Sequence, residues 1–250
     1  MPVFQAWFTD ASIRFRIRAL KALLRNERRE LGEIRRHLRA GDIACDIGGN
    51  KGSFVYWLSR WVRDGRVIVF EPQPELARNL ANICRIMGLA NVTVEARAVH
   101  SHSGEMNLYV PKQHQPGASL RPETATTGDV SVLAVPVIAL DAYFGATDRI
   151  ALLKIDVEGA ELAVFKGAER ILRSHAPLLV FECENRHLAP GRVEDVFGFL
   201  DGLGYEGSFV CQGSLLPISQ FDAAVHQRQD GEWFWKRKGY CNNFVFRKRA

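Results

Sequence analysis

Short apolar runs alternate with longer amphipathic segments from residue 42 onwards. The runs are rich in β-branched and other apolar residues, as in strands buried on both faces of a parallel sheet. We therefore predict strands over 42–47, 66–71, 92–97, 150–156 and 178–183. Apolar residues three or four positions apart predict helices over 52–63, 74–88, 159–173 and 193–203. This alternation is typical of a doubly wound α/β domain with a mostly parallel sheet.

Two further pairs of strands lie outside the alternation. Segments 105–110 and 132–137 flank a stretch rich in Gly, Pro, Ser and Thr, and we expect them to form a local excursion. Segments 205–211 and 242–248 predict an antiparallel pair that finishes the sheet edge. Their connection contains the run from Trp233 to Lys238, which fits two interpretations equally. It is either a packed connection with a basic tip or a surface that stacks a sugar or meets an anionic lipid head.

The N-terminal segment has a helical pattern of its own. Its apolar positions are Ile13, Ile17, Leu20, Leu24, Leu31, Ile34 and Leu38, with a break at Glu27 and arginines on the other faces. We predict one bent basic helix or two short ones, as a basic helical extension (1–40) to a main domain (41–250). The favoured interpretation is a helix that packs on the domain with its arginines solvated. Contact with a membrane surface or an anionic substrate is the alternative.

Composition places the 250-residue chain among ordinary globular proteins, with 47% hydrophobic and 24% charged residues. Five scattered cysteines without a C-x-x-C pair argue against a disulfide framework and a zinc cluster, so a reducing cytoplasm fits best. No apolar stretch approaches the roughly 18 residues of a membrane span, and none has the form of a signal peptide. We therefore expect a cytoplasmic protein, with peripheral membrane contact as the alternative.

The net charge of +5 is unevenly distributed. Residues 1–40 hold 10 Lys and Arg against 4 Asp and Glu, and residues 231–250 hold 6 against 1. A mildly acidic body therefore carries two basic ends. Because the positive charge is not spread over one face of a domain, nucleic acid is not the favoured partner.

The first candidate for chemistry is the turn Asp46-Ile47-Gly48-Gly49-Asn50-Lys51-Gly52, between the first strand and a helix. Glycines let a backbone approach a ligand closely, and a helix N-terminus offers free N–H groups. Glu71 ends the next strand, about twenty residues on, where a carboxylate can accept both hydroxyls of a ribose. These features predict a site for a cofactor that contains a nucleoside.

The charge of the turn indicates which cofactor. A dinucleotide site has the pattern G-x-G-x-x-G and leaves the turn free of acids, whereas here Asp46 lies at the strand tip. A carboxylate there repels a pyrophosphate but suits the ammonium and sulfonium charges of S-adenosylmethionine. The turn also lacks the Lys-Ser/Thr pair of a nucleotide triphosphate site. We therefore predict S-adenosylmethionine as the cofactor.

A second cluster of acids follows the strand over 150–156. Asp156 and Glu158 fall at the carboxyl edge of the sheet, where ligands bind in doubly wound folds. The adjacent strand brings Glu182 and His187 to the same edge, and we expect Lys154 to be an ion-pair partner.

A hydroxyl acceptor needs a group that receives its proton. The candidates for this base are Asp156, Glu158, Glu182 and His187. A Mg²⁺ or Mn²⁺ ion held by Asp156, Glu158 and Glu182 is the less favoured alternative. His100 and His102 have no third ligand at a matching spacing, so we expect no metal there.

The segments DIGGNKG, VFEPQP, RAVHSHSG, VIALDAYF, LLKIDVEGAELAVFKGAERIL and LLVFEC resemble, in order and spacing, the FkbM-type S-adenosylmethionine-dependent methyltransferases. The resemblance covers about residues 42–184. It implies a class I methyltransferase fold and, in most members, transfer to hydroxyls of polyketides, sugars or glycolipid-like molecules. It also implies the cofactor contacts: Asp46, Gly48, Gly49, Asn50 and Gly52 in the turn at the methionine part, Glu71 at the ribose and Ala98 at the adenine.

The acceptor is predicted from a motif that the chain lacks. Methylation of planar amines is marked by Asn or Asp followed by Pro-Pro-Tyr, and this chain has Asp156-Val157-Glu158-Gly159 in that place. Oxygen is therefore the favoured acceptor, as a hydroxyl of a sugar, glycolipid or secondary metabolite. The alternatives are a nucleic-acid methyltransferase and a non-catalytic binding protein with the same fold.

Overall fold

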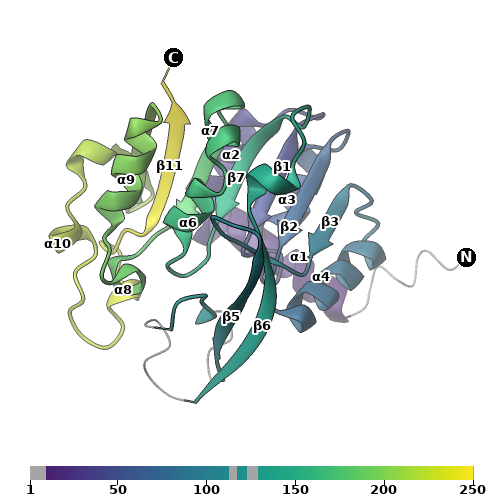
Figure 1. The fold of residues 1–250 in the computed structure, drawn as a ribbon, viewed down its shortest axis with the longest axis horizontal. Coiled ribbons are helices and arrows are strands. Elements are labelled where there is room, and N and C mark those ends of the chain that lie inside the picture. The colour runs from purple at the N-terminus through teal and green to yellow at the C-terminus, as the bar shows by residue number, and fades with distance from the viewer. Residues whose placement is uncertain (1–9, 113–116, 123–128, 250) are drawn as a thin grey trace, which may run out of the picture.

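A computed structural model describes residues 10–112, 117–122 and 129–249. Within them, eight strands form the central sheet in the order β10-β9-β11-β8-β7-β1-β2-β3 (Figure 1). The parallel strands are β1 (Ile43–Ile47), β2 (Arg66–Phe70), β3 (Val92–Glu95), β7 (Ile150–Ile155) and β8 (Leu178–Glu182). The antiparallel strands are β9 (Tyr205–Cys211), β10 (Ser214–Pro217) and β11 (Asn243–Lys248). The predicted α/β fold with a mostly parallel sheet is confirmed.

The C-terminal strands differ in order from the prediction. β9 and β11 pair in antiparallel fashion as expected, but β11 lies between β8 and β9. The edge is formed instead by β10, which the sequence analysis did not predict. It joins β9 through a two-residue turn, in which Gln212 and Gly213 have φ of +48° and +78°, as tight hairpin turns require.

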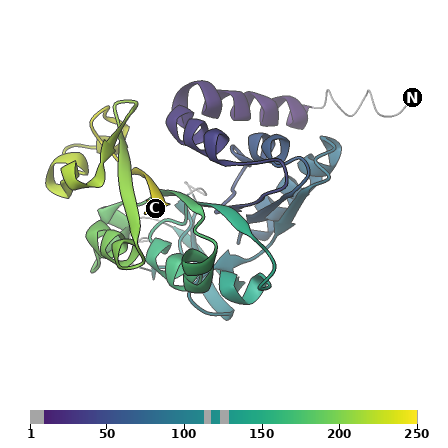
Figure 2. The same ribbon diagram turned by 90° about the horizontal axis from the view of Figure 1, so that it is seen from above.

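Helices cover both faces of the sheet (Figure 2). One face packs against α1 (Asp10–Lys21), η2 (Ala22–Asn26), α2 (Arg28–His37), α3 (Val55–Trp61) and α4 (Pro74–Ile86). The other packs against α5 (Leu140–Tyr143), α6 (Glu161–Lys166), α7 (Glu169–Ser174) and α9 (Val193–Gly202). Short helices follow at α8 (Asn185–Leu188), η5 (Ile218–Gln220), α10 (Ala223–His226) and η6 (Phe234–Lys236). No helix in the described ranges is long and apolar enough to cross a membrane.

The predicted helix over 159–173 is divided into α6 and α7. The break lies at Gly167, where a Cβ atom would stand 2.1 Å from the carbonyl oxygen of His100. The close passage of this neighbouring backbone explains why one helix does not continue through the segment.

The N-terminal helices complete one face of the sheet. The break expected at Glu27 is present, since η2 ends at Asn26 and α2 begins at Arg28. Leu31 and Ile34 of α2 are fully buried against the sheet, as their spacing predicted.

The packing face of α1, however, is not the predicted apolar stripe. α1 and η2 bury Ser12, Phe15, Ala19 and Ala22, whereas Ile13, Ile17, Leu20 and Leu24 are exposed. Close packing explains why small side chains face the domain here. The indole of Trp57 donates to the carbonyl of Ala19 at 2.8 Å, and this approach leaves room only for small side chains.

The predicted excursion is a separate three-stranded sheet. β5 (Gly104–Pro111) and β6 (Val130–Ile138) pair along their length, and β4 (Ala98–Val99) adds to β6. Leu108 and Val135 are buried in a small core of its own. Figure 1 shows β5 and β6 extending past the carboxyl edge of the central sheet.

Candidate active site

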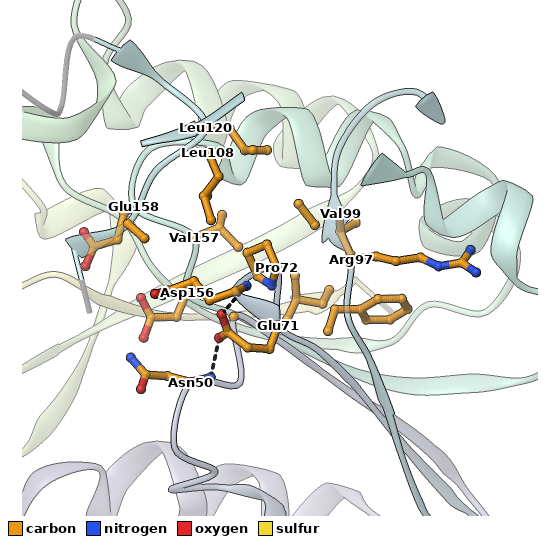
Figure 3. A pocket seen from close by; sticks show the side chains of 16 residues that line it. Asn50, Glu71, Pro72, Arg97, Val99, Leu108, Leu120, Asp156, Val157 and Glu158 are labelled. Atoms are coloured by element: carbon orange, nitrogen blue, oxygen red, sulfur yellow. Dashed lines mark hydrogen bonds between the residues drawn. The ribbon is translucent and has the colours of Figure 1, made fainter. Parts of the chain in front are cut away.

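A pocket lies between the carboxyl edge of the central sheet and the small sheet. Figure 3 shows Asn50, Asp156 and Glu158 toward one end, Val99 and Arg97 toward the other. Glu71 lies between the two ends, and Leu108 and Leu120 cover the pocket from the small sheet. The pocket therefore has carboxylates at one end, Val99 and a guanidinium at the other, and leucines along one wall.

The turn after β1 is held tightly in place. The N–H groups of Gly48 and Gly49 donate to the carbonyl of Phe70 at 2.9 and 3.1 Å. Gly48 has a φ of +79°, and a Cβ atom there would stand 1.7 Å from the carbonyl oxygen of Asp156. Only glycine permits this contact, which brings the two predicted motifs together.

Glu71 is 3% exposed and holds the same turn. One carboxylate oxygen accepts the N–H of Asn50 at 2.8 Å and the other accepts the N–H of Gln73 at 2.9 Å (Figure 3). Burial raises the pKa of Glu71, as do Asp46 and Asp156, while the two N–H groups oppose the rise. A carboxylate has about four acceptor positions, so Glu71 can still accept ribose hydroxyls.

A buried lysine connects the strands of the site. Lys154 Nζ lies 3.4 Å from Asp46 Oδ1 and 3.6 Å from Asp156 Oδ2. Burial disfavours the ammonium, but the two carboxylates outweigh this effect and raise the pKa of Lys154. Lys154 is therefore the ion-pair partner that the sequence predicted.

Glu158 and His187 form a pair at the acidic end of the pocket. His187 Nε2 lies 2.9 Å from Glu158 Oε2. Gly159 makes this approach possible, because its φ is +102° and a Cβ atom would stand 2.3 Å from the carbonyl oxygen of His187. The Ser119 hydroxyl donates to the Glu158 carbonyl at 2.6 Å and connects the pair to the small sheet.

Two further acids follow β8. Glu182 accepts a hydrogen bond from Asn242 Nδ2 at 2.7 Å, and burial raises its pKa well above the ordinary value, with Asp156 and Glu158 adding to the rise. Glu184 is also buried, yet hydrogen bonds from Arg186 and Tyr240 lower its pKa. Glu184 is thus held by Arg186 and Tyr240, whereas Glu182 has Asn242 as its partner and forms no ion pair in the described contacts.

The structure brings the predicted site residues to one edge. Those that line the pocket are Gly48, Asn50, Glu71, Ala98, Asp156 and Glu158. Those that lie beside it are Asp46, Gly49, Gly52, Glu182 and His187. A Cβ atom on Gly52 would meet Phe15 and Leu80, so this glycine permits helix packing behind the turn.

Sequence reasoning missed the wall supplied by the small sheet. Leu108, Ala118 and Leu120 line the pocket, and Ser119 pairs with Tyr109 through two backbone hydrogen bonds. Residues 117–122 have no periodicity that would mark them. Only the apolar Leu108 inside a predicted strand was a usable signal.

The described residues contain no group of three or more His, Cys, Asp or Glu side chains arranged to hold a metal ion. His100 and His102 approach through their Nδ1 atoms, 3.2 Å apart. The acids proposed as metal ligands are instead engaged by Lys154, His187 and Asn242.

The model of a family described as "Methyltransferase FkbM domain" matches residues 46–206. The matched range contains every residue proposed above for the pocket and its acidic end. We find no match to the chain among curated proteins.

Solved structures share the fold at low sequence identity. An FkbM methyltransferase from Methylobacillus flagellatus KT has a TM-score of 0.54 at 16% identity, over 98% of this chain and 56% of its own. A proposed rRNA methylase from Clostridium thermocellum has a TM-score of 0.54 at 11% sequence identity, and the match covers 90% of this chain and 96% of that protein. A proposed methyltransferase from Streptococcus mutans in complex with SAH has a TM-score of 0.53 at 11% sequence identity, and the match covers 90% of this chain and 98% of that protein. The chain thus spans little more than half the length of the first of these.

Proposed function

Because the chain belongs to the FkbM family of S-adenosylmethionine-dependent methyltransferases, we propose that it methylates a hydroxyl of a sugar, glycolipid or secondary metabolite. S-adenosylmethionine supplies a methyl group already activated by its sulfonium charge. The protein has to align the acceptor oxygen and receive the hydroxyl proton.

The pocket residues fit this cofactor. The main contact of Asp46 Oδ1 is Lys154 at 3.4 Å, a distance long for a hydrogen bond, which leaves acceptor capacity for a cationic ligand group. We propose that Asp46 and the turn Gly48-Gly49-Asn50-Lys51-Gly52 hold the methionine part and Glu71 the ribose. Ala98 would then lie at the adenine, at the end of the pocket that Val99 also lines.

The observation that carries the proposal is the pair of Glu158 and His187 beside the pocket. Glu158 lines the pocket, and His187 contacts one of its two carboxylate oxygens. In our proposal Glu158 receives the proton of the acceptor hydroxyl, and His187 acts as a positioning residue that orients the carboxylate. An alcohol becomes a good nucleophile only as its proton leaves, so a receiver at this place favours oxygen chemistry.

The charge of the site disfavours nucleic acid. Asp46, Asp156 and Glu158 lie at one end of the site with Lys154 between the first two, and Arg97 lines the opposite end of the pocket. A phosphodiester backbone would meet net negative charge there, whereas a neutral polyhydroxylated acceptor would find acceptors for its hydroxyls. The uncharged acceptor is therefore the better match.

The test is transfer of labelled methyl from S-adenosylmethionine to a panel of sugars, glycolipids and hydroxylated metabolites, beside amine analogues and RNA. We expect label on hydroxyl acceptors, with turnover of Glu158→Gln lower by at least about 100-fold at unchanged cofactor affinity. Glu169→Gln, at a half-exposed ion pair with Arg173, is the matched control.

His187→Gln should shift the pH–rate profile, which a merely structural role would leave in place. Label on amines or RNA, or normal turnover of Glu158→Gln, would refute the proposal.

A further inference from the structure

α1 and η2 together expose a stripe of large apolar side chains. Ile13, Ile17, Leu20 and Leu24 are 40%, 47%, 49% and 60% exposed, and their spacing of four, three and four places them on one side of the helix. Nine large apolar side chains of the described residues are exposed, and four of them are in this stripe. Figure 2 shows α1 on the outer side of its helical layer, away from the sheet.

The exposed stripe is not the face of the helix that packs on the domain. α1 and η2 bury Ser12, Phe15, Ala19 and Ala22 and turn four Ile and Leu side chains outward. Burial of Leu or Ile stabilises a fold more than burial of Ala or Ser, so a helix used only to cover the core would turn its Ile and Leu side chains inward. The stripe therefore fits a surface that contacts an apolar partner outside the domain.

Positive charge runs beside the stripe. Arg14, Lys21 and Arg25 are exposed, and a helical rotation of about 100° per residue places Arg14 and Lys21 along one flank. The acid of the helix is Asp10, which pairs with Arg14 at 3.2 Å. The exposed side of this helix is therefore apolar along its centre and basic along its flank.

We propose that this face of α1 and η2 docks on a membrane surface that contains anionic lipids. An interfacial helix inserts its apolar side chains at the headgroup boundary while Lys and Arg contact anionic headgroups. A second copy of the chain is a poorer occupant, because two basic flanks would repel each other. Docking needs no turnover, so the proposal stands apart from the methyl-transfer function.

The position of the helix gives docking a defined orientation. Arg18 of α1 donates to the carbonyl of Lys51 at 2.9 Å, in the turn that carries Gly48 and Gly52. Phe15 packs behind the same turn. A docked α1 would therefore hold the cofactor turn close to the membrane surface.

Co-sedimentation with lipid vesicles tests the proposal on the full chain. We expect binding to phosphatidylcholine vesicles that contain phosphatidylglycerol, and much weaker binding to phosphatidylcholine alone. The variant Arg14→Gln/Lys21→Gln/Arg25→Gln should bind roughly a hundredfold more weakly, because each charge contributes about a factor of five near an anionic surface. Ile17→Ser/Leu20→Ser/Leu24→Ser should lose at least about tenfold.

Val132→Ser/Val225→Ser removes exposed apolar side chains elsewhere and should bind like the wild type. All these positions are exposed, so thermal unfolding should confirm that every variant is folded. Failure of the wild type to bind anionic vesicles, or equal binding by the apolar variant, would overturn the proposal. So would a concentration-dependent dimer that the apolar variant abolishes while vesicles have no effect.

Discussion

Replacement of Glu71 by Ala tests the cofactor site most directly. The side chain accepts one N–H from Asn50 and one from Gln73, and it is the proposed acceptor of both ribose hydroxyls. Loss of two charge-assisted hydrogen bonds to the cofactor should cost roughly 2 to 5 kcal/mol of binding free energy. This corresponds to a dissociation constant raised by about 30-fold to several thousand-fold.

The substitution should also lower the folding stability, but by less than it lowers the free energy of cofactor binding. Two backbone N–H groups lose their partner, and each costs roughly 1 to 3 kcal/mol if it stays dry. The side chain borders the pocket, so water can enter and satisfy them, which keeps the loss of stability near the lower limit. Removal of a carboxylate whose pKa is raised by burial offsets part of the remainder.

Calorimetric titration with S-adenosylmethionine measures the first effect and denaturant unfolding the second. Glu75→Ala, an exposed residue in the first turn of α4, is the control with the same change of charge. A folded Glu71→Ala variant with the cofactor affinity of the wild type would refute the reasoning and remove Glu71 from the site.

Three further predictions follow from the described contacts. Deletion of residues 1–36 should cause aggregation in size-exclusion chromatography, because it removes Leu31 and Ile34 from the core; a monomeric, cofactor-binding product would contradict the packing described. Asp156→Asn should keep cofactor affinity and lose less than about 100-fold in turnover, because Asp156 pairs with Lys154 and Glu158 is the proposed base; a larger loss would assign the base to Asp156. EDTA should leave wild-type activity unchanged, whereas loss with EDTA and recovery with added Mg²⁺ or Mn²⁺ would establish the metal alternative. Burial raises the pKa of Glu161 from 4.5 to about 7. The buried carboxylate therefore lowers the unfolding free energy by up to about 3 kcal/mol above pH 7 and has no such effect below pH 4.5. The stability of Glu161→Gln relative to the wild type should therefore rise between about pH 4.5 and pH 7, and a constant difference in unfolding free energy would exclude this cost.

The parallel core of the fold was predictable because its strands are buried on both faces. Ile43–Ile47 is buried throughout, and such runs keep their signature without knowledge of their partners. The acids of the site were predictable for a related reason, since parallel strands end at one edge. Asp46 lies near the end of β1, and Glu71 and Asp156 directly follow β2 and β7, so the three meet at that edge.

Features that depend on distant contacts were not predictable. The stripe from Ile13 to Leu24 was visible in the sequence, but periodicity does not specify which face packs on the domain. The role of residues 117–122 depends on the contact between Ser119 and Glu158, which lie 39 positions apart. The place of β11 depends on pairing with two strands that are separate in the sequence.

The position of β11 bears on how the chain folds during synthesis. β11 leaves the ribosome after all the other strands of the sheet, yet it inserts between β8 and β9. Its Arg247 pairs with Glu33 of α2 at 2.7 Å, and Val245 shares a core with Leu31. The buried face of α2 therefore stays incompletely covered until β11 is made more than two hundred residues later, and chaperones have access to Leu31 and Ile34 during that interval.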